Sequence, residues 1–206
     1  MSFWVAGINH MAWFLELKWQ GRDAYPLLRE AMENPEIHEK DTVRFEIFRH
    51  FDYFVTESSG HMSEYVPYFR KSQEKLEPFR LRHRQPEENP VYRGRWGEDT
   101  PLSRQLAGEE PISLAGSHEY ASGIIHAVHT NTPGRINGNV RNNGCISNLP
   151  PQCCVEVPCL VDRTGIRPCR VGALPTQVAA LNQANVVVQE LTARAFLEKD
   201  KRKAYQ

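Results

Sequence analysis

Gly7-Ile8-Asn9-His10-Met11-Ala12-Trp13-Phe14-Leu15-Glu16-Leu17 lies close to the start of the chain. The stretch is apolar and aromatic apart from one histidine in its first half. Ile8, Phe14 and Leu17 suit a buried strand, and Gly7-Ile8-Asn9 suits a tight entry into it. We therefore predict an opening strand over these residues and expect the remaining elements to pack around it.

His10 is the residue of this strand that a hydrophobic core does not need. A single histidine among apolar residues is commonly a hydrogen-bonded core imidazole, since histidine is intermediate in its preference for burial. A neutral imidazole is also the commonest metal-binding side chain. The strand by itself leaves both interpretations of His10 open.

Composition excludes several classes of protein. The chain has 206 residues, 40% of them hydrophobic, with 25 Lys plus Arg balanced by 25 Asp plus Glu. Zero net charge argues against nucleic acid or an anionic membrane as the main partner, and no apolar run reaches the ~20 residues of a membrane span. Met1-Ser2-Phe3-Trp4 lacks the pattern of a signal peptide. The five cysteines form no CxxC, so we expect free thiols in a reducing cytoplasm.

Turn and periodicity signals predict the elements of the first half. Leu17–Asp23 indicates a hairpin turn or loop, and a helix is expected over Tyr25–Glu33. Asp41-Thr42 is a candidate cap for a second helix over Val43–Phe51. Tyr53–Lys71 then mixes aromatic residues with small polar ones, which predicts an irregular loop. That loop contains three polar candidates for function: His61, Glu64 and Tyr65.

Residues of about 72–116 are polar and rich in Arg, Pro and Glu. This composition predicts an excursion from the domain rather than part of its core. Its arginines suit a solvated surface or, alternatively, contact with an acidic partner subunit: Arg80, Arg82, Arg84, Arg93 and Arg95.

The second half mixes helices and strands. Helical spacing covers Ser117–Val128, whose histidines 118, 126 and 129 lack the HExxH pattern of a metal site. Asn143-Gly144 indicates a turn, and strands are expected over Cys153–Asp162 and Arg167–Val171. A long helix over Thr176–Lys199 has a predicted core face of Ala180, Leu181, Ala184, Val188, Leu191, Ala195 and Phe196.

These elements predict an α+β domain with a mixed sheet packed against helices. Its polar site would combine the early strand, the loop around Tyr65 and the Asn-rich turn. No GxGxxG or Walker A loop is present in the sequence, so no cofactor-binding residue is assigned.

Several segments together resemble glycoside hydrolase family 4, in particular its α-galactosidase (melibiase) branch. The matching segments are Gly7–Phe14, Tyr53–Ser59, Ser63–Phe69, Glu119–Ser122, Gly138–Asn142 and Asn148–Pro150 through Cys154–Val157. The resemblance covers nearly the whole chain. It implies a C-terminal domain like that of lactate and malate dehydrogenases, a homo-oligomer (dimer or tetramer) and an α-galactoside substrate.

The resemblance also implies unusual chemistry, because this NAD-dependent group does not use the paired carboxylates of ordinary glycosidases. NAD oxidises the sugar at C3, a base removes the C2 proton, and the aglycone is eliminated. A divalent metal, usually Mn²⁺, polarises the sugar oxygens. His10 matches the metal-binding histidine, and Tyr65 is the best match for the C2 base, with Tyr68 and Glu64 as alternatives. Asn9, Asn142 and Asn143 are expected near the sugar.

The sequence departs from the family in one respect. The family begins with a Rossmann-like NAD-binding domain carrying a metal-binding cysteine and a candidate general acid, and no counterpart is found in this chain. We therefore expect a truncated C-terminal, substrate-side portion, or one piece of a split enzyme with a separate Rossmann fragment. The alternatives are an inactive fragment, an oligomerisation module, or a family 4 α-glucosidase or α-glucuronidase fragment.

Overall fold

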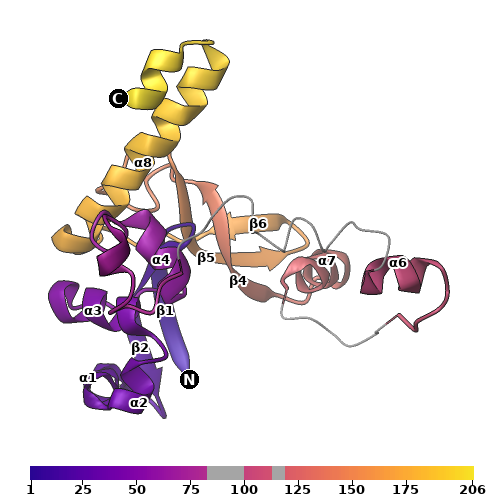
Figure 1. Ribbon diagram of the computed structural model, residues 1–206. Coiled ribbons are helices and arrows are strands. Elements are labelled where there is room, and N and C mark those ends of the chain that lie inside the picture. The colour runs from indigo at the N-terminus through magenta and orange to yellow at the C-terminus, as the bar shows by residue number, and fades with distance from the viewer. Residues whose placement is uncertain (83–99, 113–118) are drawn as a thin grey trace.

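The computed structural model describes residues 1–82, 100–112 and 119–206. Its sheet has six strands in the order β3-β2-β1-β5-β4, with β6 paired to β5. The expected α+β class is confirmed, and every pair of named strands is antiparallel. Helices α1, α3, α4 and α8 gather around the β1–β2 part of the sheet (Figure 1). Among the described residues, no helix is long and apolar enough to cross a bilayer.

The predicted opening strand is in fact a hairpin of β1 (Ser2–Ile8) and β2 (Met11–Trp19). Ile8 pairs with Met11, so Asn9 and His10 form the turn. His10 has a φ of 62°, in the left-handed region that Asn and His tolerate better than most residues. Gly7 is required beside the turn, because a Cβ there would lie 2.3 Å from the carbonyl oxygen of Met11. A second turn, before β3 (Arg22–Asp23), confirms the hairpin expected over 17–23.

The helices of the first half confirm two predictions and correct one. Helix α1 (Tyr25–Glu33) has the predicted bounds, α2 (Pro35–His38) follows it, and α3 (Thr42–Phe51) matches the second predicted helix. The expected irregular loop instead contains α4 (Ser59–Tyr65), followed by the short η1 (Gln73–Lys75). Helix α4 forms because Met62 is fully buried in the main core, a tertiary contact that composition does not show.

The Asp41 side chain does not cap α3. Its carboxylate instead binds Arg44 Nη1 at 2.7 Å and Ser59 Oγ at 2.7 Å, which ties the start of α3 to the start of α4.

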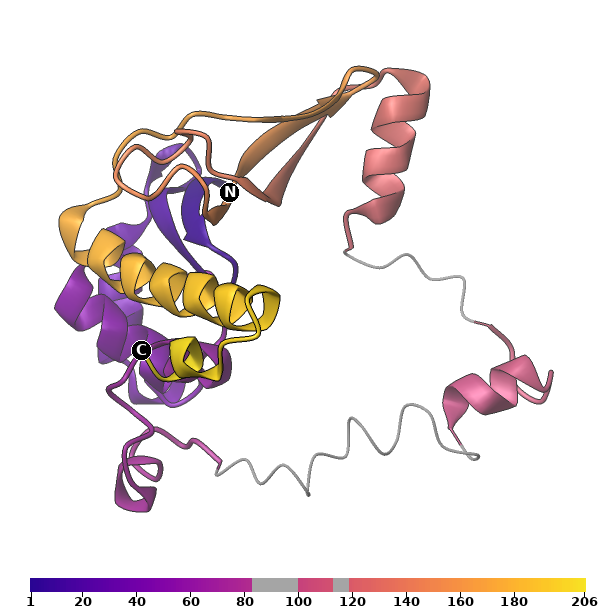
Figure 2. The same cartoon turned by 90° about the horizontal axis from the view of Figure 1, so that it is seen from above.

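A long hairpin of β4 (Gly134–Arg141) and β5 (Cys154–Asp162) extends from the body, with β6 (Gly165–Pro168) beside it. Helix α7 (Ala121–Thr130) packs against β4 and β5 at the far end of the hairpin (Figure 2). Its described bounds begin at Ala121. The start expected at Ser117 falls on residues 113–118, which lie outside the described residues. All five cysteines are free, as predicted.

The polar excursion is described only in part. It contains α6 (Pro101–Leu106), and Arg80 forms an ion pair with Glu39 at 2.7 Å. Arg84, Arg93 and Arg95 lie outside the described residues.

Helix α8 (Thr176–Leu197), followed by η3 (Lys201–Tyr205), has the predicted position but a different core face. Only its first half is buried, through Val178, Ala179, Leu181, Asn182 and Val186. Val188 and Phe196, which were expected in the core, are 62% and 83% exposed. Buried Asn182 joins α8 to the first hairpin: Trp13 Nε1 donates to its Oδ1 at 2.9 Å, and its Nδ2 donates to the Met11 carbonyl at 2.8 Å.

Candidate functional site

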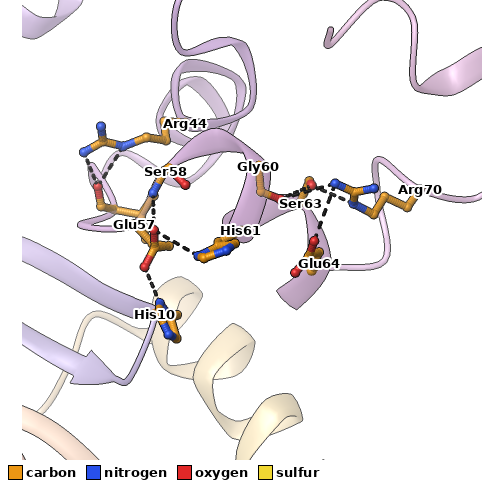
Figure 3. A network of polar contacts seen from close by, with 10 residues as sticks. His10, Arg44, Glu57, Ser58, Gly60, His61, Ser63, Glu64 and Arg70 are labelled. Carbon is orange, nitrogen blue, oxygen red and sulfur yellow. Dashed lines mark hydrogen bonds and ion pairs between the residues drawn. The ribbon is translucent and has the colours of Figure 1, made fainter. Parts of the chain in front are cut away.

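His10 lies at the tip of the β1–β2 hairpin with its side chain 39% exposed. Its Nδ1 contacts Oε2 of Glu57 (Figure 3). The alternative of a core imidazole satisfied inside the domain is therefore wrong, because one edge of the ring binds a carboxylate and the ring remains partly open to solvent.

Glu57 links two imidazoles. Its Oε1 lies 3.3 Å from Nδ1 of His61 and accepts the backbone N–H of Ser58 at 2.8 Å. The rings of His10 and His61 lie 5.2 Å apart, centroid to centroid, at 83°. Burial alone would raise the pKa of Glu57, but the hydrogen bonds from His10 and Ser58 hold it below its usual value.

Backbone contacts hold Glu57 in place. The N–H of Thr56 donates to the Ala12 carbonyl at 2.9 Å, which joins this segment to β2. Arg44 donates to the Val55 carbonyl from Nε at 3.1 Å and from Nη2 at 2.7 Å (Figure 3). Glu57 is therefore held on one side by the hairpin and on the other by α3.

Tyr65 lies one helical turn after His61 on α4, and its ring centroid is 5.9 Å from that of His10. The alternative bases point elsewhere: Glu64 lies 3.7 Å from Arg70, and Tyr68 stacks on Phe51. Burial, with the charges of Glu57 and Glu64, raises the pKa of Tyr65. A tyrosine base requires a lowered pKa, so the described surroundings of Tyr65 disfavour that role. A bound cation nearby would favour the phenolate and lower the pKa of Tyr65.

The three predicted asparagines have different surroundings. Asn9 is exposed beside His10 and accepts a hydrogen bond from Asn139 Nδ2 at 3.3 Å. Asn142 is fully buried, with its Nδ2 directed to the carbonyls of Ile146, Leu149 and Pro150 and its Oδ1 to the N–H of Ile146. Its amide stabilises the turn, so we do not assign it a contact with sugar. Asn143 is exposed in that turn with a φ of 43°.

Two carboxylates near His10, those of Glu57 and Glu156, are not among the residues predicted for the site. Glu57 and His61 are spaced i and i+4, a signal visible in the sequence but obscured by the prediction of an irregular loop. Glu156, on β5, pairs with Gly7 across the sheet, so only the tertiary structure brings it near. The pKa of Glu156 is raised above its usual value, mainly by burial. The charge of Glu57 adds to this rise, and the nearby His10 offsets part of it.

The donor set fits a divalent cation. One ligand atom each from His10, Glu57 and His61 lie within 4.8 Å of one another. Imidazole nitrogen and carboxylate oxygen are both ligands of first-row divalent ions, and carboxylate suits Mn²⁺. For NAD, the sequence offers no glycine-rich phosphate cradle, so none of its residues is assigned to hold the dinucleotide.

The family model for the Family 4 glycosyl hydrolase C-terminal domain matches residues 5–206. The chain belongs to glycosyl hydrolase family 4. An alpha-galactosidase of Bacillus subtilis (strain 168) is 41% identical over 98% of this chain and 47% of its own length. An alpha-galactosidase of Rhizobium meliloti (strain 1021) is 30% identical over 97% of this chain and 43% of its own. The chain thus spans about half the length of the family 4 relatives that it matches.

Solved structures share this family 4 fold. A putative glucosidase, lplD, of Bacillus subtilis superposes with a TM-score of 0.82 at 23% identity, over 100% of this chain and 50% of that one. A 6-phospho-beta glucosidase of Thermotoga maritima, solved with manganese, NAD+ and glucose-6-phosphate, gives a TM-score of 0.68 at 20% identity. The superposition covers 98% of this chain and 46% of the Thermotoga maritima chain.

Proposed function

We propose that this chain is the sugar- and metal-binding half of a family 4 α-galactosidase that hydrolyses O-glycosidic bonds. The observation that carries the proposal is the partly open cluster in which His10 meets Glu57, His61 and Tyr65. The identity of 41% with an alpha-galactosidase, against 27% with a maltose-6'-phosphate glucosidase, favours the galactoside branch.

His10 is the proposed ligand for a divalent cation, with Mn²⁺ as the ion that the family resemblance implies. When bound, the cation supplies Lewis-acid contact to sugar oxygens and the dinucleotide supplies hydride transfer. Tyr65 is the proposed base at sugar C2, because its ring lies 5.9 Å from that of His10. Asn9 is the proposed contact for a sugar hydroxyl, since its amide is exposed at the same turn.

The test is to mix this chain with a separately produced first half of the Bacillus subtilis alpha-galactosidase and assay an aryl α-galactoside. We expect hydrolysis that requires NAD and Mn²⁺ and is lost in His10→Ala. The chain alone should be inactive under the same conditions. Turnover by the chain alone, or by the mixture regardless of His10, would contradict the proposal.

A further inference from the structure

We propose that the outward face of α8 is the surface on which the first half of a family 4 enzyme docks. This face is called the outer stripe, and it consists of six apolar residues: Ala180, Ala184, Val187, Val188, Leu191 and Ala195. The inference rests on the proposed function, because it names the surface through which this chain meets the other half of the enzyme.

Helix α8 carries apolar residues on two faces. Its buried face consists of Val178, Ala179, Leu181, Asn182 and Val186. At 100° per residue, the centre of the outer stripe lies about 160° around the helix from the centre of the buried face. From residue 180 to residue 195 the sector of the outer stripe holds apolar residues alone. A helix that is apolar on both sides is expected to be covered on both sides.

The outer stripe is largely open in this chain. Ala180 and Ala184 are exposed, and the exposed fractions of Val187 and Val188 are 43% and 62%. The two remaining residues of the stripe are half-buried, toward the end of α8 that η3 contacts. The last turns of α8 extend beyond the body of the domain (Figure 1). Contiguous exposed apolar surface marks an interaction site, so the open stripe indicates a partner.

The outer stripe has the form of a helix-packing surface. Its residues recur at i, i+4, i+7, i+8, i+11 and i+15, over about 22 Å of helix. Alanines lie at both ends, and the larger Val187, Val188 and Leu191 lie in the middle. Small residues let a second helix approach closely, while the larger ones fit between its side chains. We therefore expect an apolar helix of the partner to lie along the stripe.

Two observations favour the first half of the enzyme as that partner. The chain covers 47% and 43% of two alpha-galactosidases, so these relatives have about as much chain again. Helix α8 also borders the candidate site: Asn182 donates to the Met11 carbonyl at 2.8 Å and Asn185 to the Tyr65 carbonyl at 2.9 Å. A half that brings a dinucleotide to His10 must therefore approach α8.

The size of the stripe disfavours a second copy of this chain. A strip about 22 Å long on a helix about 10 Å wide has a footprint of about 220 Å². A stable interface buries about 800 Å² on each partner. Two outer stripes in contact therefore fall well short of that area, whereas the first half of the enzyme can add contacts around the candidate site.

The first experiment co-expresses the tagged chain with the first half of the Bacillus subtilis alpha-galactosidase and measures their association without NAD, metal or sugar. We expect the two to co-purify. Val188→Glu and Ala184→Glu place a charge in the stripe and should each weaken association by at least about tenfold.

The matched control is Ala193→Glu. Ala193 is also exposed on α8, about 170° around the helix from the centre of the stripe, so its substitution should leave association unchanged. All three substituted positions are exposed in the chain alone. Circular dichroism and urea midpoints of the chain alone should therefore be unaltered in every variant.

The second experiment does not require either half to be stable by itself. A single polypeptide joins the same first half to the start of this chain, and hydrogen exchange of residues 184–195 is compared with that of the chain alone. We expect these amides to exchange at least about tenfold more slowly in the joined polypeptide. Val188→Glu should restore fast exchange, and Ala193→Glu should not.

Four results would overturn the inference: no association, association insensitive to Val188→Glu, equal weakening by Ala193→Glu, or unchanged exchange in the joined polypeptide. A dimer of the chain alone that Val188→Glu dissociates would make a second copy the occupant and would also overturn it. Stripe-dependent association in a mixture that fails the galactoside assay would contradict the proposed function and leave this inference standing.

Discussion

At the scale of single residues, His10 combines a left-handed backbone with a functional side chain. Its φ of 62° places it in a region that costs most residues with a Cβ about 1 kcal/mol or more. The two-residue turn between Ile8 and Met11 demands that conformation. The same turn projects the imidazole toward Glu57, so the turn geometry delivers the ring to the site.

This backbone predicts a difference between two substitutions that both remove the imidazole. Asparagine tolerates the left-handed region better than alanine does. We expect His10→Asn to be more stable than His10→Ala by about 0.5–1 kcal/mol. Urea unfolding of the two variants measures the difference. Equal stabilities would indicate that the turn relaxes once the ring is removed.

Tyr25 is predicted to make stability depend on alkaline pH. Its hydroxyl contacts the Phe14 carbonyl and accepts from the Phe54 N–H at 3.3 Å, and burial raises its pKa from 10.0 to about 12. The unfolded chain releases this proton near pH 10.0 and the folded chain only near pH 12. Stability from this group is therefore complete below pH 10.0 and falls as the pH rises toward 12.

Tyr25→Phe should lose about 1 kcal/mol at pH 7 and should show a shallower fall in stability at alkaline pH. Urea unfolding at several pH values measures both effects. Tyr205→Phe is the control, since Tyr205 is 91% exposed and should leave both unchanged. An alkaline fall equally steep in Tyr25→Phe would contradict the role of this phenol.

At the scale of elements, α8 has two unlike halves. Its first half is buried in the main core at Val178 and is joined to the β1–β2 hairpin by the hydrogen bonds of Asn182. Its second half leaves Val188 and Phe196 exposed. Helical periodicity was nearly uniform along this segment, so it could not indicate where the contact with the sheet ends.

This division predicts unequal costs for truncating apolar residues of one helix. Val178→Ala should lower the free energy of unfolding by about 2 kcal/mol, because Val178 is fully buried. Phe196→Ala should change it by less than about 0.5 kcal/mol despite the larger side chain. Urea midpoints compare them directly. A large cost for Phe196→Ala in the monomeric chain would mean that its ring is packed.

At the scale of the whole molecule, the sheet brings distant segments to one site. The hairpin turn, the segment before α4 and strand β5 contribute His10, Glu57 and Glu156. The β4–β5 hairpin extends away from this site and ends beside α7 (Figure 2), where Ile125 and Ile166 are exposed. The expected homo-oligomer and the separate Rossmann fragment remain predictions.

The charge of this site predicts the class of sugar. Glu57 and Glu156 lie near His10, and like charges disfavour a dianionic phosphate. If the proposed function holds, the chain mixed with the first half of the Bacillus subtilis alpha-galactosidase should prefer a non-phosphorylated α-galactoside to a 6-phosphoglucoside by at least about tenfold in kcat/KM. Side-by-side assays of the two aryl glycosides test this. Preference for the phosphorylated sugar would assign the chain to a different branch.

The sequence by itself determined the α+β class, the bounds of α1, the positions of α3 and α8, and His10 with Tyr65 as site candidates. These follow from local signals: turn residues, helical periodicity and motifs resembling family 4. The tertiary structure alone decided that residues 7–17 fold back at Asn9-His10, that α4 is a helix, and that the Asn142 amide is buried. It also brought Glu57 and Glu156 to His10. These features depend on burial and on hydrogen bonds between residues far apart in the chain, which no local pattern of residues specifies.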